Sequence, residues 1–414
     1  MSIQTINPAT GDVIQTYEEM SEDQINGVLD QAKGGFEVWR KMSFDMRATC
    51  MKKVAAMLKD NVNVYAEMIT KEMGKPITQS RGEILKCAWV CEYFADKAAD
   101  YLKPEIIKTE MTKSFVTYQP QGTIFSIMPW NFPFWQVFRF AAPNLMAGNV
   151  GVLSHAPIST GAAIMIQDIF KEAGFPEGVF TSVVVDIDQA AKIIADPRVF
   201  AVTLTGSERA GKAVGANAAG NLKKVVLELG GSDPYVVLKD ADLEVAAQAC
   251  ITSRLLNAGQ VCISAKRLIV EESIYDAFKA KIIPLIEAYQ PGDPMSEDTN
   301  FGPMARSDLR DELERQVQDS IAKGADCLMG GKKIDGKGFY FEPTLLENVK
   351  PGMPAYDQEL FGPVVSLIRA KDEAEALRIA NDTPYGLGAA VFTQDLAKGE
   401  KIATEHLNAG ICAV

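Results

Sequence analysis

Short, fully apolar runs alternate with helical patterns from residue 120 to residue 229. We expect strands at residues 123–128, 149–153, 181–185, 200–204 and 224–229, and helices at residues 160–173, 187–195 and 208–219. Fully apolar strands joined by helices are typical of a parallel sheet that has helices on both faces. The pattern therefore predicts the α/β class with a doubly wound sheet.

A second alternating series follows the break at Gly230 and Gly231. We expect strands at residues 234–238, 266–270, 341–345, 364–369 and 389–392, and helices at residues 243–257 and 274–289. A chain of 414 residues is too long for a single small core. The break therefore predicts two α/β domains, residues 1–229 and residues 230–414.

The first hundred residues have mostly helical spacing. A turn is expected at residues 7–11, and Ser21 with Asp23 is a typical helix start. Residues 114–119 alternate between polar and apolar in the manner of a strand.

Composition narrows the class of partner. The chain is 47% hydrophobic and 23% charged, which is ordinary for a globular protein, and its net charge is −12. An acidic chain without a basic stripe argues against a nucleic-acid partner. No apolar run is long enough to span a bilayer, so no membrane partner is expected. The 7 scattered cysteines and the absence of a signal peptide pattern favour a cytoplasmic protein with reduced thiols, and no metal site is expected.

Three separated motifs contain residues that together could oxidise a carbonyl compound. Cys262 ends the run Asn-Ala-Gly-Gln-Val-Cys, Glu228 lies in Leu-Glu-Leu-Gly-Gly, and Asn131 lies in Pro-Trp-Asn-Phe-Pro. A thiolate can add to a carbonyl, an amide N–H can bind the resulting oxyanion, and a carboxylate can activate water. Taken singly, they also fit a buried thiol, a salt-bridged strand end and a turn asparagine. The combination favours catalysis.

These three motifs resemble those of the aldehyde dehydrogenase superfamily, and the resemblance covers the whole chain. It implies two Rossmann-related α/β domains and a small oligomerisation arm. Residues 1–229 would bind the dinucleotide, with residues 111–120 in the arm, and residues 230–414 would carry the nucleophile. It also implies a two-step reaction through a cysteine hemithioacetal and a thioester, with Cys262, Asn131 and Glu228 in the roles given above.

The cofactor is expected to be NADP or NAD. A helix follows Gly206 and Ser207, with Gly211 in its first turns, and such a helix start suits a pyrophosphate as well as it suits a plain turn. The resemblance favours the first reading. It also implies that Glu359 binds the nicotinamide ribose and Phe361 packs near the ring. Two further residues are assigned to the cofactor on the same ground, Trp130 and Leu229.

Ser154 and Pro157 depart from the family pattern. The family nearly always has lysine at the first position, and its NAD-specific members often have glutamate at the second. A missing carboxylate at position 157 removes repulsion against a 2′-phosphate and so permits NADP. A missing lysine at position 154 removes a cation that would help to bind either cofactor.

The substrate is expected to be succinate semialdehyde. Arg139 lies among aromatic residues after the Asn131 motif, where a guanidinium could bind a substrate carboxylate, although an ordinary inter-helix cation would look the same. This stretch, together with the residues that follow Cys262, resembles bacterial succinate-semialdehyde dehydrogenases. The residues assigned to the substrate are Arg139, Phe132, Trp135 and Ser264.

The chain stops at Val414, and family members usually continue for several tens of residues. A homodimer or homotetramer is expected if the usual C-terminal segment is present. Two alternatives stay open: a broad-range aldehyde dehydrogenase without a carboxylate preference, and a truncated, poorly catalytic dinucleotide-binding homologue.

Overall fold

The computed structural model describes residues 2–414, and these residues divide into two compact units. The first comprises the residues up to Ile6, Val13–Glu72 and Ile77–Glu228. The second comprises Asn7–Asp12, Met73–Pro76 and Leu229–Val414. The two short segments join the second unit through contacts distant in sequence, such as the 2.8 Å hydrogen bond from Phe339 N to the Pro8 carbonyl.

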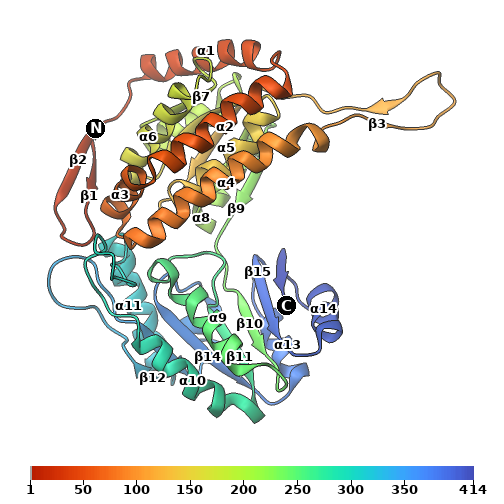
Figure 1. The fold of residues 1–414 in the computed structure, drawn as a ribbon. Coiled ribbons are helices and arrows are strands. Elements are labelled where there is room, and N and C mark those ends of the chain that lie inside the picture. The colour runs from red at the N-terminus through yellow and green to blue at the C-terminus, as the bar shows by residue number, and fades with distance from the viewer. Residues whose placement is uncertain (1) are drawn as a thin grey trace. The chain divides into compact units, whose positions relative to one another are not determined.

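A five-stranded, fully parallel sheet forms the centre of the first unit (Figure 1). Its strand order is β7-β6-β5-β8-β9. The bounds are β5 (Thr123–Met128), β6 (Val150–His155), β7 (Phe180–Val183), β8 (Val199–Thr205) and β9 (Lys224–Glu228). Because β6 and β8 flank β5, the order reverses there, and the carboxyl ends of strands at such a point are where open α/β sheets bind ligands.

Helices pack against this sheet and against one another. The helices that contact its strands are α1 (Glu22–Trp39), α5 (Trp135–Met146), α6 (Thr160–Glu172), α7 (Ile187–Ala195) and α8 (Glu208–Gly220). A further layer consists of α2 (Phe44–Asp60) and α4 (Ile77–Tyr101), which lie side by side and contact α5. The remaining elements are the hairpin β1 (Ser2–Ile6) and β2 (Val13–Glu18), helix α3 (Val62–Met73) and the short helix η1 (Pro157–Ser159).

The second unit is built on a seven-stranded sheet with the order β12-β13-β14-β11-β10-β15-β16. All neighbours are parallel except β12 and β13. The bounds are β10 (Pro234–Val237), β11 (Arg267–Glu271), β12 (Asp326–Met329), β13 (Thr344–Glu347), β14 (Val364–Ala370), β15 (Gly388–Phe392) and β16 (Ile411–Ala413). Its helices are α9 (Leu243–Leu255), α10 (Tyr275–Glu287), α11 (Ser307–Ala322), α12 (Pro354–Asp357), α13 (Glu373–Asn381) and α14 (Leu396–Glu405), with short helices η2 (Leu256–Gly259) and η3 (Glu272–Ile274).

Successive residues of the central strands enter two separate cores. In β11, Leu268 and Val270 pack with residues of α9 and α10, whereas Ile269 packs with residues of α11 and α13 on the other face. Both faces of this sheet are therefore covered, which explains why its strands appear in the sequence as continuous apolar runs. The predicted α/β class with parallel, helix-covered sheets is confirmed.

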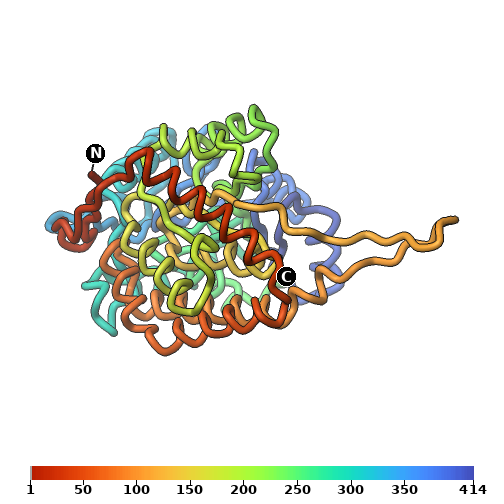
Figure 2. The backbone as a smooth tube through the Cα atoms, turned by 90° about the horizontal axis from the view of Figure 1, so that it is seen from above, coloured from red at the N-terminus to blue at the C-terminus, as the bar shows by residue number. Residues whose placement is uncertain are grey.

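The strand predicted at residues 114–119 is wrong in extent. Only β4 (Phe115–Val116) forms, and it pairs antiparallel with β3 (Glu105–Ile106) in a hairpin that projects from the first unit (Figure 2). The hairpin has no core beneath it, because both strands are exposed on both faces. Alternation alone cannot extend a strand that lacks a surface to pack on.

The strand predicted at residues 341–345 also begins too early, because β13 starts at Thr344, directly after Pro343. Proline has no N–H to donate to a sheet, so the regular ladder begins only after it.

None of the helices in residues 2–414 is long and apolar enough to cross a bilayer.

Glu72 provides a test of the first unit's stability. Its carboxylate is fully buried and accepts hydrogen bonds from Gly161 N (2.8 Å) and Ala162 N (3.0 Å) at the start of α6. Burial raises the pKa of Glu72 to about 7, while the two amide bonds oppose that rise. A folded-state pKa above the unfolded one stabilises the protein most at low pH, and this stability is lost as pH rises through 7.

We therefore expect Glu72→Gln to flatten the pH dependence of stability. Relative to this variant, the wild type should lose about 2–3 kcal/mol between pH 5 and pH 8. Urea unfolding at several pH values measures the difference. Glu67→Gln, on the same helix but exposed and paired with Lys71, is the control and should follow the wild type. Parallel curves for the wild type and Glu72→Gln would contradict the prediction.

Candidate active site

The carboxyl edge of the first sheet carries several of the predicted site residues. Asn131 follows β5, and Ser207 follows β8, its neighbour at the point where the strand order reverses. Ser154 lies near the end of β6, and Glu228 ends β9, where it is in register with Thr205. Parallel strands present their carboxyl ends at one edge, so a single edge of this unit carries all four.

Two buried side chains hold the loop that contains Asn131. Glu83 accepts hydrogen bonds from Phe134 N and Trp135 N, both at 2.9 Å, and so caps the start of α5. His155 Nε2 lies 2.9 Å from the Pro133 carbonyl, which can only accept, so this nitrogen is the donor. Burial lowers the pKa of His155 to about 4 and keeps the ring neutral. Asn131 is itself buried, with 4% exposure. These bonds fix the residues that directly follow Asn131, and a rigid amide donor requires such support.

Arg139 and Glu228 form an ion pair in the first unit. The guanidinium lies 3.6 Å from the Glu228 carboxylate and 3.5 Å from the Thr205 hydroxyl. Both side chains are about 40% exposed and line a groove of about 840 Å³, together with Gln136 and Lys224. The predicted substrate cation therefore has a carboxylate partner in this structure, and that partner is the predicted base.

Helix α8 has Ser207 as its N-cap residue. The Ser207 hydroxyl accepts a hydrogen bond from Ala210 N at 3.3 Å. Gly211 was expected to contact the cofactor. Its N–H donates to the Ser207 carbonyl at 2.9 Å as part of the helix, so a contact with a phosphate would not use this amide. Gly206 has no neighbour closer than 3.9 Å to an added Cβ.

The remaining first-unit residues of the prediction have varied environments. Trp130 and Phe132 are partly buried beside Asn131, and Trp135 lies under the Lys86 ammonium at 3.9 Å from the ring centre. Ser154 is buried, whereas Pro157 is exposed at the start of η1.

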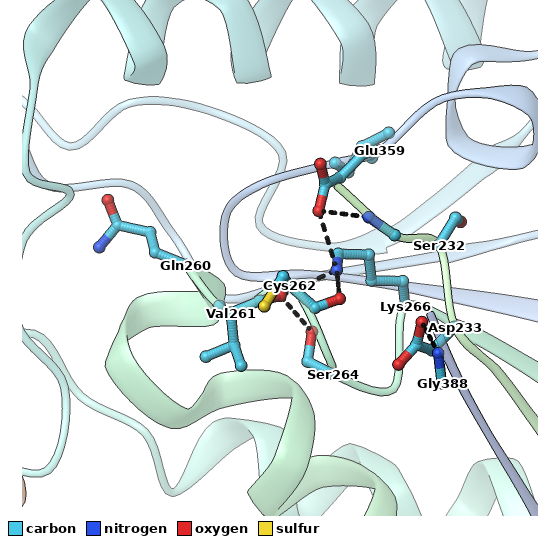
Figure 3. Close-up of polar contacts among 12 residues, drawn as sticks. Ser232, Asp233, Gln260, Val261, Cys262, Ser264, Lys266, Glu359 and Gly388 are labelled. Atoms are coloured by element: carbon cyan, nitrogen blue, oxygen red, sulfur yellow. Dashed lines mark hydrogen bonds and ion pairs between the residues drawn. The ribbon is translucent and has the colours of Figure 1, made fainter. Parts of the chain in front are cut away.

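In the second unit, the predicted site residues lie at the amino edge of the sheet. The Gly230–Gly231 turn precedes β10, Cys262 precedes β11, and Glu359 precedes β14. Leu229, at the start of this unit, is partly buried beside the glycines. Because the strand order here is β14-β11-β10, the three loops are neighbours, and Figure 3 shows Cys262 and Glu359 on either side of Lys266.

Lys266 joins these loops and was not identified from the sequence. Its Nζ donates to the carbonyls of Val261 (2.8 Å) and Cys262 (2.6 Å) and lies 3.1 Å from Glu359 Oε1. The same oxygen accepts Gly231 N at 3.2 Å. Phe361 lies beside the lysine, with its ring centre 6.0 Å from Nζ.

Arg254 is a second buried cation that the sequence did not reveal. Its guanidinium donates to the carbonyls of Val364 (2.6 Å), Leu360 (2.7 Å) and Gly259 (3.0 Å), and also to that of Gly362. It thereby ties the loop before Cys262 to the loop after Glu359. The sequence did offer one signal, a single arginine among the apolar residues of a helix. An arginine is almost never buried unless hydrogen-bond acceptors surround it.

Ser264 corrects another expectation. It is fully buried, accepts a hydrogen bond from Arg254 at 3.0 Å and donates to the Val261 carbonyl at 3.2 Å. It therefore presents no surface to a substrate, and it stabilises the loop that carries Cys262.

The backbone before Cys262 has an unusual conformation. Asn257, Ala258 and Gly259 have φ values of 54°, 51° and 73°, in the left-handed region. An added Cβ at Gly259 would lie 2.2 Å from the Gly362 carbonyl oxygen, so only glycine fits there.

Burial raises the pKa of the Cys262 thiol above its usual value. Lys266 acts in the opposite direction, whereas Glu359 and Asp233 add to the rise. Burial likewise raises the pKa of Asp233 to about 6, against the influence of Lys266. The protein alone therefore favours the neutral thiol, and the groups that favour the thiolate are the Lys266 ammonium and, less strongly, the Ile263 backbone N–H.

Comparison with known proteins decides the family. The chain matches the aldehyde dehydrogenase family over residues 1–414. It belongs to the aldehyde dehydrogenase family. This confirms the family inferred from the three motifs.

Relatives from two bacteria share nearly half of the sequence. A probable succinate-semialdehyde dehydrogenase [NADP(+)] of Synechocystis is 46% identical over 402 residues, which cover 97% of this chain and 88% of that protein. A succinate semialdehyde dehydrogenase [NAD(P)+] of Escherichia coli is 46% identical over 399 residues, covering 96% of this chain and 86% of that protein.

A solved structure agrees in fold. The crystal structure of succinic semialdehyde dehydrogenase from Streptococcus pyogenes in complex with NADP+ has a TM-score of 0.97 and 36% identity, and the match covers 99% of this chain and 90% of that one. The predicted aldehyde dehydrogenase fold is therefore confirmed.

The close contact at Gly259 yields a prediction. Gly259→Ala should destabilise the protein by about 2–5 kcal/mol, from the strained φ and the clash with Gly362. It should also displace the Cys262 loop. Urea midpoints and the rate of Cys262 alkylation measure the two effects.

The matched control is Gly220→Ala, at a helical glycine with nothing within 4 Å of an added Cβ. That variant should be as stable as the wild type or slightly more stable. Equal stability of Gly259→Ala and the wild type would show that the contact with Gly362 is not restrictive.

Proposed function

We propose that this protein oxidises succinate semialdehyde to succinate with NADP or NAD. The observation that carries the choice of substrate is Arg139, a cation that faces an open groove beside Glu228. The relatives named as succinate-semialdehyde dehydrogenases support the same substrate. Arg139 would bind the substrate carboxylate, with Phe132 and Trp135 packing against the carbon chain.

In the first half of the proposed reaction, Cys262 Sγ adds to the aldehyde carbon. The oxyanion that forms would accept hydrogen bonds from the Cys262 backbone N–H and the Asn131 amide. A bound nicotinamide would supply the hydride acceptor that conversion of the adduct into a thioester requires.

In the second half, Glu228 takes a proton from water, which attacks the thioester carbon. The carbon–sulfur bond breaks and the acid leaves. The proton taken up by Glu228 is returned to the departing sulfur, which regenerates the Cys262 thiol. Glu228 is partly exposed at the end of β9, so water reaches it in this structure.

The residues present fit a dinucleotide. The capped start of α8 offers backbone N–H groups with positive dipole character to a pyrophosphate, with Ser207 and Gly206 at the turn. Glu359 is 19% exposed, and its carboxylate is oriented by Lys266 and Gly231, as a ribose diol would require. Position 157 is proline, so no carboxylate there opposes a 2′-phosphate, and Ser154, Trp130, Leu229 and Phe361 complete the proposed cofactor set.

Arg139→Met tests the substrate. We expect its kcat/KM for succinate semialdehyde to fall roughly 10- to 100-fold, the cost of losing a charged hydrogen bond. Butanal has no carboxylate, so a fall in its kcat/KM shows an effect of the substitution that acts through Glu228. The measurement is the rise in reduced-nicotinamide absorbance with each aldehyde.

Two variants control this experiment. Lys224→Met removes another cation from the same groove and should leave the substrate preference unchanged. Cys262→Ala should abolish both activities. If Arg139→Met lowers kcat/KM equally for both aldehydes, Arg139 acts through Glu228 and not on the substrate carboxylate. If the wild type has equal kcat/KM for both aldehydes, the protein is a broad-range aldehyde dehydrogenase. If the wild type oxidises neither, it is a poorly catalytic homologue.

We also propose that the protein is a homodimer or homotetramer joined in part by the β3–β4 hairpin. The hairpin exposes Ile106 (68%), Met111 (65%) and Phe115 (49%), and both of its edges lack a further strand among the described residues. Such surfaces favour pairing with another chain.

Light scattering should give a multiple of 45.1 kDa for the wild type. The Phe115→Glu substitution should reduce that mass. A monomeric wild type at micromolar concentration would contradict this assembly.

A further inference from the structure

Lys266 is a buried lysine whose side chain contacts the loop that carries Cys262. Its side chain is 2% exposed and lies directly before β11. Figure 3 shows Nζ between the carboxylate of Glu359 and the backbone of Cys262.

The acceptors around Lys266 match a protonated amine. An ammonium has three N–H groups, and there are three acceptors: the Val261 and Cys262 carbonyls and Glu359 Oε1. A neutral amine has two N–H groups and would leave one acceptor unpaired. Burial and the nearby Arg254 guanidinium lower the pKa of Lys266, and the carboxylates of Glu359 and Asp233 oppose this.

The Val261 carbonyl and the Cys262 N–H are the two ends of one peptide group. A peptide is planar, so the direction of its carbonyl fixes the direction of its N–H. The Val261 oxygen accepts from Lys266 Nζ at 2.8 Å and from the Ser264 hydroxyl at 3.2 Å. Both lone pairs are therefore used, and the peptide has little freedom to rotate.

We propose that Lys266 is a positioning residue that orients and polarises the Val261–Cys262 peptide, so that the Cys262 N–H is a strong oxyanion donor. A cation at the carbonyl end of a peptide strengthens donation from its N–H end. The assignment rests on the proposed function, which uses this N–H in the first half of the reaction.

The ion pair gives Lys266 a second effect. Glu359, the proposed ribose ligand, and the oxyanion donor share one ammonium, so a shift of the Glu359 carboxylate moves the lysine that holds the peptide. Gly230 makes this arrangement possible, because an added Cβ would lie 2.2 Å from Glu359 Oε2. Cofactor binding and readiness of the oxyanion site are therefore connected through Lys266.

Two probes separate the oxyanion from the thiol. Iodoacetamide alkylates Cys262 without forming an oxyanion, whereas p-nitrophenyl acetate acylates it through one. Both rates are measured on the 414-residue protein without aldehyde or dinucleotide, as a function of pH. The rate of Cys262→Ala is subtracted in each case, because other thiols also react.

In Lys266→Met, we expect acylation to fall roughly 10- to 100-fold at equal thiolate fraction, and alkylation to fall less than about 3-fold. The pH midpoint of alkylation should rise, because Lys266 is the cation facing this thiol while Glu359 and Asp233 face it as anions. Lys266→Arg keeps a cation with N–H donors and should restore most of the acylation rate. If Lys266→Met does not fold, Lys266→Gln, a neutral donor, serves in its place and should lie between the two.

Lys279→Met is the matched control, because Lys279 is also partly buried and paired with a carboxylate, at 2.9 Å from Glu347. It should change neither rate. Equal losses in both reactions, or no loss in either, would overturn the proposal. If Cys262→Ala keeps the full esterase rate, the nucleophile is wrong; if only succinate semialdehyde oxidation is missing, the proposed substrate fails and Lys266 keeps its role.

Discussion

The second unit depends on one buried guanidinium, that of Arg254. Its carbonyl acceptors lie at the end of η2, in the loop after Glu359 and at the first residue of β14, where regular helix or sheet hydrogen bonding ends. Arg254 donates to four carbonyls, those of Gly259, Leu360, Gly362 and Val364, and to the Ser264 hydroxyl. Burying a cation is costly, and this cost is offset because its donors meet fixed oxygens. These bonds tie the loop before Cys262 to the loop after Glu359 at the edge of the sheet.

This support explains why the reactive thiol lies where it does. Cysteines are commonly activated at a helix N-terminus, where the dipole favours a thiolate. Cys262 instead follows the C-terminal end of α9 and precedes a strand, so no such dipole assists it. The local cation is Lys266, and its charge is shared with Glu359. In the free protein the thiol is consequently neutral, which also makes it a poor target for oxidation.

The sequence predicted regular elements well wherever burial alone determines them. Residues 123–128 and 187–195 form β5 and α7 with the predicted bounds, because a buried apolar run and a capped amphipathic turn are local signals. The β1–β2 hairpin, α11 and β12 were not predicted. In β2 most side chains are exposed and in β12 half of them are, so the pattern is weak. Arg254 and Lys266 could not be assigned either, since their acceptors lie up to about a hundred residues away in the chain.

The Arg139–Glu228 pair bears on how the proposed substrate would enter. Its charges are 3.6 Å apart and both side chains are about 40% exposed, so water screens their attraction. Pairs of this kind contribute on the order of 0–1 kcal/mol. A substrate carboxylate that can accept two hydrogen bonds from the guanidinium forms a stronger interaction than the one it displaces. Exchange of partners at Arg139 would therefore cost little, and it would leave the Glu228 carboxylate open to water.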